Sequence, residues 1–265
     1  MSFATATKVV RRNPHTWMAR VHPGWDIFGV PNGGYLMVML ARAMEAETNG
    51  RDLITLTTHF LRPAEPGPVA ITVDEIKVGR TLSTLRATML QDGKELVTAV
   101  AAFADPRRPL PDTQMTDSSP PHLPPPEECV LAEPSKTGPF PPPFTGQIVL
   151  RIHPDDAVFF NGDPTGIARI RGWFRLQEGD PPDPLSPLLA ADAFPPAVFN
   201  ANLPLNWTPT VEMTTHLRDS QPRTWLKCSF HTRFVTHGLL EEDGEIWDEE
   251  GNLVALSRQL ALVPR

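Results

Sequence analysis

Proline is concentrated in one part of this chain. Thirteen of the 31 prolines in the 265 residues lie between Pro106 and Pro143, where two runs of three consecutive prolines occur. Proline lacks a backbone N–H and fixes φ, so neither a helix interior nor a sheet interior accepts this density. We therefore predict an extended linker over residues 106–146, between an N-terminal domain (1–105) and a C-terminal domain (147–265).

The N-terminal domain is predicted to contain one helix followed by antiparallel strands. An apolar stretch at residues 35–44 follows a candidate N-cap, Asn32, and precedes a stop signal, Asn49-Gly50. The stretch is apolar nearly all round, which is typical of a helix enclosed by other structure. Turn signals separate the predicted strands, which cover residues 16–21, 53–61, 69–78, 82–90 and 95–103.

The C-terminal domain shows the same order of elements. A helix is predicted at residues 185–194, where Pro195-Pro196 ends it. Turns are expected at Asp243-Gly244 and Glu250-Gly251. Strands are predicted at residues 167–176, 210–217, 225–235, 239–247 and 253–263.

Short matching strings support an internal duplication. Thr58-His59 aligns with Thr215-His216, and Leu96-Val97 aligns with Leu253-Val254, in the same order as the predicted elements. Because each helix precedes a series of strands instead of alternating with them, the pattern favours an α+β fold over a doubly wound parallel sheet. The sequence contains no glycine-rich dinucleotide or phosphate-binding motif.

Composition excludes several classes of partner. The formal net charge of −7 argues against nucleic acid or an anionic membrane surface, since both require a cationic face. No run approaches the roughly 18 apolar residues of a membrane span, and the N-terminus lacks the apolar region of a signal peptide. Two cysteines form no disulfide framework, so a cytoplasmic protein is expected.

An ordered set of motifs runs through both halves. The C-terminal half carries Ala191-Asp192-Ala193-Phe194-Pro195-Pro196, Pro209-Thr210-Val211-Glu212 and Ser257-Arg258-Gln259. The N-terminal half carries Gly24-Trp25-Asp26-Ile27, Pro31-Asn32-Gly33-Gly34-Tyr35-Leu36, His59-Phe60-Leu61-Arg62-Pro63 and Val78-Gly79-Arg80-Thr81. Together these motifs resemble the type II (TesB-like) acyl-CoA thioesterases over nearly the whole chain outside the linker.

The resemblance implies a fold, an activity and an assembly. The implied fold is a double hotdog, two tandem antiparallel sheets each wrapped around a helix. The implied activity is hydrolysis of acyl-CoA thioesters to CoA and a free carboxylic acid by an activated water, without a cofactor. A homodimer or homotetramer of double hotdogs is expected.

The resemblance also implies a catalytic triad of Asp192, Thr210 and Gln259. A carboxylate within the apolar surroundings of Asp192 is costly unless it is hydrogen-bonded or used, whereas an exposed helix end would make it unremarkable. An amide such as Gln259 can orient a water, although a solvent-facing strand position is the plainer interpretation. Strand alternation predicts that Thr210 points away from the core, which leaves Thr214 and Thr215 as alternatives.

The duplication favours placing the chemistry in the C-terminal half. At the aligned positions, Leu53 stands opposite Thr210, and Ala102 stands opposite Gln259. The N-terminal half therefore lacks both polar groups, and a single active site per chain is expected.

Candidate substrate-binding residues lie in the N-terminal half. Asn32, Gly33 and Gly34 at a helix start can present N–H groups to a carbonyl oxygen or a phosphate, or can simply cap and pack the helix. Arg62 and Arg80 are candidates for the CoA phosphates, although isolated basic residues near turns are usually solvated. No metal site is expected, since no metal-binding histidine spacing is present.

Two other functions fit the same fold. A non-catalytic protein that binds acyl-CoA or a lipid-like ligand would use the same apolar tunnel. Hydration or dehydration of an enoyl thioester ranks last, because such hotdog enzymes commonly carry a histidine on the helix and neither predicted helix contains one.

Overall fold

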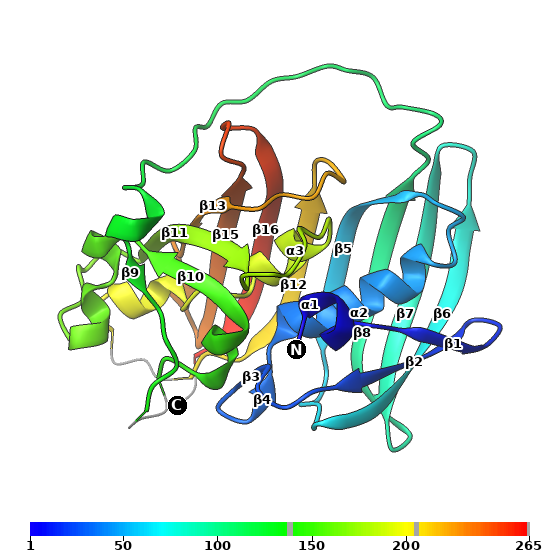
Figure 1. Ribbon diagram of the computed structural model, residues 1–265, viewed down its shortest axis with the longest axis horizontal. Helices are drawn as coiled ribbons and strands as arrows, with labels where there is room; N and C mark the ends of the chain where they lie inside the picture. The colour runs from blue at the N-terminus through cyan, green and yellow to red at the C-terminus, as the bar shows by residue number, and fades with distance from the viewer. Residues whose placement is uncertain (137–139, 204–206, 264–265) are drawn as a thin grey trace.

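The computed structural model describes residues 1–136, 140–203 and 207–263. The two halves of the chain lie side by side in it, and the stretch after residue 105 arches over them as a long loop that leads from the first half to the second (Figure 1). None of the helices in these ranges is long and apolar enough to cross a membrane.

The N-terminal half contains two helices and eight strands. The helices are α1 (Phe3–Ala6) and α2 (Gly33–Glu45). The strands are β1 (Val10–Asn13), β2 (Thr16–Val21), β3 (Asp26–Ile27), β4 (Val30–Pro31), β5 (Asp52–Phe60), β6 (Gly67–Val78), β7 (Leu82–Gln91) and β8 (Lys94–Ala104).

The remainder of the chain is richer in short elements. Its α-helix is α3 (Ser186–Ala190), and its 3₁₀-helices are η1 (Pro126–Glu128), η2 (Pro143–Gln147), η3 (Pro154–Asp156), η4 (Val158–Asn161) and η5 (Ala197–Asn200). The strands are β9 (Val130–Leu131), β10 (Ile148–Ile152), β11 (Arg169–Leu176), β12 (Thr210–Leu217), β13 (Leu226–His231), β14 (Val235–Thr236), β15 (Leu239–Trp247) and β16 (Leu253–Leu262).

One 14-stranded antiparallel sheet joins both halves. Its order is β1-β2-β6-β7-β8-β5-β12-β16-β15-β13-β11-β10-β9, with β14 beside β15. Strands β5 and β12 pair at the centre of the sheet. From there the strands β8, β7 and β6 on one side correspond in order to β16, β15 and β13 on the other. Thr57 and Thr214 are opposite each other in that central pair, and their hydroxyls are 2.9 Å apart. This pseudo-twofold arrangement is the double hotdog.

Helix α2 is the buried helix of the N-terminal half. It begins after Asn32, whose side chain accepts the Tyr35 N–H at 2.9 Å as an N-cap. Every residue from Gly34 to Ala41 is buried, because α2 packs against β5 to β8 on one side and against α3 on another. The predicted helix and its cap are therefore confirmed.

The helix of the C-terminal half is shorter than predicted. Only Ser186–Ala190 is helical, and the chain then tightens into a turn in which the Asp192 N–H donates to Leu189 O and the Ala193 N–H to Ala190 O. These bonds span three residues, the 3₁₀ pattern that closes many helices. Asp192 therefore lies just beyond the helix and not within it.

Five strands were missed by the sequence analysis, namely β1, β3, β4, β9 and β10. Strand β10 pairs with β11 and buries Ile148, Leu150 and Ile152 in strict alternation, a signal that the sequence does contain. Strand β9, within the range expected to be linker, pairs with β10. Residues 106–125 contain no helix or strand.

The predicted turn at Asp243-Gly244 is wrong, because both residues lie in the middle of β15. A Cβ on Gly244 would lie 2.3 Å from the Ser257 hydroxyl oxygen and 2.5 Å from the Phe230 ring. The glycine is thus explained by close packing across the sheet and not by a turn. Likewise, the single strand predicted at 225–235 is divided into β13 and β14.

Candidate active site

A cavity of about 280 Å³ lies between the two halves. Its walls come from the start of α2, the end of β5, the segment before β10 and the turn after α3. Apolar side chains make up most of the cavity lining. The aromatic residues of the lining come from both halves and are Phe28, Phe60, Phe140, Phe144, Phe160, Phe194, Phe199 and Trp207. The polar side chains among them include Asn32, Asp192, Thr210, Glu242 and Gln259.

Asp192 is held by the start of α2, from the other half of the chain. Its Oδ2 accepts the Gly34 N–H at 2.9 Å and the Asn32 side-chain amide at 2.9 Å. The same Asn32 nitrogen is 2.7 Å from the Asp192 backbone carbonyl. Helix N-termini carry unpaired N–H groups and a partial positive charge, so α2 is a suitable partner for a carboxylate.

The environment of Asp192 tunes its acidity. Burial raises the pKa of Asp192 to about 6, opposed by hydrogen bonds from the backbone N–H groups of Gly34 and Gly33. A carboxylate with this pKa is ionised at neutral pH and is a stronger base than an ordinary aspartate. The group has the properties of a general base.

Thr210 and Gln259 are brought together on adjacent strands. The Thr210 hydroxyl donates to Gln259 Oε1 at 3.1 Å, and both residues line the cavity. Alternation predicted that Thr210 would point away from the core, but the pairing of β12 with β16 shifts register between Thr210 and Glu212. A bulge of this kind re-aims the side chain at the strand start, which is why the alternation argument failed.

The two alternative threonines lie elsewhere. The Thr214 hydroxyl contacts Thr57 and donates to Glu212 Oε1 at 2.6 Å, and Thr215 is completely buried. Neither is among the residues that line the cavity.

Glu242, on β15, is a cavity residue that the sequence analysis missed. It lies opposite Gln259 in the strand register, and its Oε1 accepts the Gln259 side-chain amide at 3.1 Å. Its Oε2 accepts the Ala197 N–H at 2.5 Å. Burial raises the pKa of Glu242 to about 8, and the nearby charge of Asp192 adds to this shift. Glu242 stands between Glu241 and Asp243 on this strand, so the sequence offered no signal that distinguishes it.

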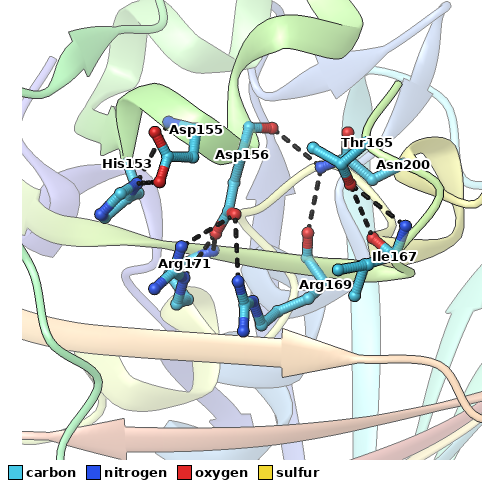
Figure 2. A network of polar contacts seen from close by, with 8 residues as sticks. All are labelled: His153, Asp155, Asp156, Thr165, Ile167, Arg169, Arg171 and Asn200. Atoms are coloured by element: carbon cyan, nitrogen blue, oxygen red, sulfur yellow. Dashed lines mark hydrogen bonds and ion pairs between the residues drawn. The ribbon is translucent and has the colours of Figure 1, made fainter.

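A separate polar network holds η5, the helix that begins with Ala197 (Figure 2). Asp156 accepts a bidentate pair from the Arg171 guanidinium at 2.7 and 3.0 Å. The Asn200 side-chain amide donates to the backbone carbonyls of Asp156 and Arg169 at 2.8 and 3.0 Å. Through Asn200 the network ties the C-terminal end of η5 to η3 and β11 beside the cavity.

Strand pairing defines which N-terminal residues correspond to the polar cavity residues. Leu53 pairs with Phe103 as Thr210 pairs with Ala261, which supports the predicted correspondence of Leu53 with Thr210. The counterpart of Gln259 is Ala101, one residue from the Ala102 that the alignment gave. Ala101 pairs with Leu56 and Gln259 pairs with Met213, and the two partners are equivalent in the repeat.

By the same pairing, the counterpart of Glu242 is Leu85, which pairs with Ala101 as Glu242 pairs with Gln259. Leu53, Leu85 and Ala101 are all buried. The N-terminal half thus fills these three positions with apolar side chains.

The predicted binding residues divide into two groups. Asn32 lines the cavity and Gly34 does not, and the Asn32 side-chain amide and the Gly34 N–H both donate to Asp192, so neither is free for a substrate oxygen or a phosphate. Gly33 also lines the cavity, and a Cβ there would lie 2.8 Å from the Phe60 ring. Asn32 and Gly34 therefore donate hydrogen bonds to the Asp192 carboxylate, and Gly33 leaves room for the Phe60 ring.

Arg62 and Arg80 lie at opposite ends of the N-terminal sheet. Arg62 follows β5, is exposed at the edge of the cavity and donates to Glu95 O at 2.8 Å. Arg80 precedes Leu82, which pairs with Ala104 at the far end of the strands, and it is absent from the cavity lining. Only Arg62 is placed to meet a group at the cavity mouth. In the described ranges, no three His, Cys, Asp or Glu side chains are grouped to hold a metal ion.

Comparison with known proteins identifies the family. The model of the acyl-CoA thioesterase C-terminal domain matches residues 126–263, and the model of the N-terminal domain matches residues 21–104. A thioesterase-like protein, TwmA of Talaromyces wortmannii, is 34% identical over 94 residues, which are 34% of this chain and 27% of TwmA.

Solved structures agree with this result. A thioesterase II candidate from Thermobifida fusca YX is 33% identical, with a TM-score of 0.87 over 100% of this chain and 98% of the other. A hot dog protein of unknown function from Alicyclobacillus acidocaldarius (23% identity, TM-score 0.82, 99% and 98% covered) shares the fold. So does TesB2 of Mycobacterium marinum (18% identity, TM-score 0.73, 99% and 98% covered).

The chain belongs to the acyl-CoA thioesterase family, in its TesB-like, double-hotdog branch. It is therefore a thioesterase by family and fold.

Proposed function

We propose that the protein hydrolyses acyl-CoA thioesters to CoA and a free carboxylic acid by direct attack of a water held by Asp192, Thr210 and Gln259. The observation that carries the proposal is that these three residues, from a turn and two different strands, line one apolar cavity. An apolar cavity with a few convergent polar groups and a shifted pKa is the usual form of a small-molecule site.

In the proposed reaction, the water oxygen attacks the carbonyl carbon of the thioester while Asp192 takes a proton from that water. The tetrahedral intermediate then collapses, the C–S bond breaks, and the thiolate of CoA leaves with the bonding electron pair. A proton returned from Asp192 or from solvent completes the thiol. Thr210 and Gln259 orient the water, because the hydroxyl and the amide both have hydrogen-bonding capacity beyond the bond between them.

Cavity size favours acyl groups of short to medium length. A volume of about 280 Å³ lies at the lower end of the range for ligand pockets, and the aromatic walls suit an apolar group. The exposed Arg62 at the edge is a candidate contact for a phosphate of CoA, which would remain outside the cavity.

The cytoplasm is the proposed site of action. Cys129 and Cys228 are both free and buried, which suits a reducing compartment. A homodimer or homotetramer remains the expected assembly, to be measured by light scattering.

Thiol release from a series of acyl-CoAs tests the proposal, with wild type compared with Asp192→Ala. Hydrolysis by the wild type that the variant loses supports it. Equal rates in both would remove Asp192 from the mechanism. Stabilisation by acyl-CoA without any thiol release would instead assign a binding protein that does not turn over.

A further inference from the structure

Glu242 has no role in the mechanism proposed above, yet it is one of the most enclosed carboxyl groups of the cavity, at 5% exposure. Its two oxygens accept from two different directions, Oε1 from the Gln259 amide and Oε2 from the Ala197 N–H. Among the ion pairs of the described residues, none includes Glu242. A buried carboxyl without a cation is costly, so its retention calls for an explanation.

The fold itself does not require a carboxyl group at this position. Leu85 occupies the equivalent place in the N-terminal half, where it is 1% exposed and faces Ala101. A leucine therefore suffices to build this part of a hotdog sheet. The difference is found only in the half that also carries Thr210 and Gln259.

The contacts of Glu242 decide which way the Gln259 amide faces. The oxygen and nitrogen of a carboxamide are nearly equal in size, and only hydrogen bonding distinguishes the two orientations. Thr210 donates to the Gln259 oxygen, and Glu242 accepts from the Gln259 nitrogen. If Glu242 were removed, a flipped amide would offer its nitrogen to Thr210, and the group presented to the water would change.

We propose that Glu242 is a positioning residue, which holds the side-chain amide of Gln259 with its oxygen toward Thr210 and the reacting water. The inference rests on the hydrolysis proposed above and deepens it by one residue. Ala197 begins η5, and Asn200 at the other end of this short helix donates to the Asp156 carbonyl in the polar network of Figure 2.

The experiment uses steady-state hydrolysis of hexanoyl-CoA by the full chain. Glu242→Leu copies the N-terminal half, and Glu242→Gln keeps the size but has one acceptor for two N–H donors. A misplaced catalytic group can cost about 10²-fold, so we expect kcat to fall by about 10- to 100-fold in Glu242→Leu. KM should stay within about threefold, because the apolar side chains that line the cavity are unchanged. Glu245→Gln, on the same strand but outside the cavity, is the matched control and should keep wild-type kinetics.

Coupling to Gln259 separates positioning from a structural role. If Glu242 acts through Gln259, then Glu242→Leu should cause no further loss of kcat in a Gln259→Ala background. Independent effects would instead multiply, and that result would overturn the inference. It would also fall if Glu242→Leu and Glu242→Gln kept the wild-type kcat, or if both failed to fold, as judged by thermal unfolding.

The failure of this inference is distinguishable from failure of the proposed function. If Asp192→Ala and Gln259→Ala abolish hydrolysis while the Glu242 variants retain it, only the role of Glu242 is refuted. If the wild type releases no thiol from any acyl-CoA, both proposals fall together.

Discussion

The side-chain amide of Asn32 donates to both the carboxylate and the backbone carbonyl of Asp192, 160 residues further along the chain, at 2.9 and 2.7 Å. The proposed base of the C-terminal half is thus held by the first turn of the helix of the N-terminal half. Gly34 adds its N–H to the same oxygen. Neither half by itself supplies all the contacts of the proposed base.

Asp192→Asn should lower kcat/KM by about 10²- to 10⁴-fold, the usual contribution of a general base. In the wild type, kcat/KM should rise with pH through an apparent pKa of about 6, because Asp192 must lose its proton to act. The measurement is a pH–rate profile from pH 4.5 to 9. A wild-type profile without a limb near pH 6 would contradict the assignment of Asp192 as the base.

Asn32→Ser should move that limb to higher pH. Serine can still cap α2, but it is too short and lacks the amide to reach Asp192, so the ionised carboxylate loses one donor. Asn32→Ala should give the same shift and also lower the free energy of unfolding by about 1 kcal/mol through loss of the cap. Unchanged pH profiles in both variants would show that this hydrogen bond does not tune Asp192.

Phe140→Ala should broaden acyl selectivity toward longer chains. Phe140 belongs to the segment predicted as linker, yet it lines the cavity and contacts Phe160 and Phe199. Removing the ring enlarges the cavity, so the ratio of kcat/KM for dodecanoyl-CoA over butanoyl-CoA should rise by about tenfold or more. Phe103→Ala is the control, since Phe103 is fully buried in the N-terminal half and does not line the cavity. It should lose stability without changing the ratio.

Glu242 should make the protein less stable as pH rises. Its pKa is raised from 4.5 to about 8 by burial, so the folded state keeps a proton that the unfolded state releases in this interval. The free energy of unfolding therefore decreases across it, by about 1.4 kcal/mol per pKa unit, and levels off above pH 8. The raised pKa of Asp192 also lowers the free energy of unfolding as pH rises, but only up to about pH 6.

Denaturant unfolding of wild type and Glu242→Gln between pH 6 and 8.5 measures the contribution of Glu242. The charged neighbours Asp192 and Glu241 and the histidines are present in both proteins, so the difference isolates Glu242. Parallel pH dependence in the two proteins would refute the raised pKa.

Asp156→Ala should be strongly destabilising. Asp156 is 3% exposed and holds the guanidinium of Arg171, a side chain only 14% exposed that would be left without its partner. Breaking such a pair costs about 3–5 kcal/mol. The surface pair Arg86–Asp74 is the control, and Asp74→Ala should cost about 0–1 kcal/mol. Chemical denaturation measures both.

Much of the fold was readable from local patterns. The cap at Asn32 and the apolar run after it predicted α2, and turn signals predicted most strands of both halves within a few residues. The errors occurred where tertiary contacts override local signals. Gly244 looks like a turn residue in sequence, but it lies within a strand. A glycine is found there because Phe230 and Ser257 pack so closely that they leave no room for a Cβ.

The sequence by itself determined which residues are candidates for the proposed site. Asp192 and Gln259 could be named from motifs, and Leu53 opposite Thr210 indicated which half lacks polar groups. Motifs could not predict where Thr210 points, since its direction depends on a bulge in the pairing of β12 with β16.

Only the tertiary structure decided what surrounds Asp192 and Gln259. Hydrogen bonds between Asn32 and Asp192, and between Glu242 and Gln259, join residues that no local pattern relates. Local propensity acts over a few residues, whereas the acidity of a buried carboxyl depends on whatever donors and charges the fold brings within a few ångströms of it. Sequence therefore supplied the proposed reacting groups, and the packing of one hotdog against the other set their orientation and the pKa of Asp192.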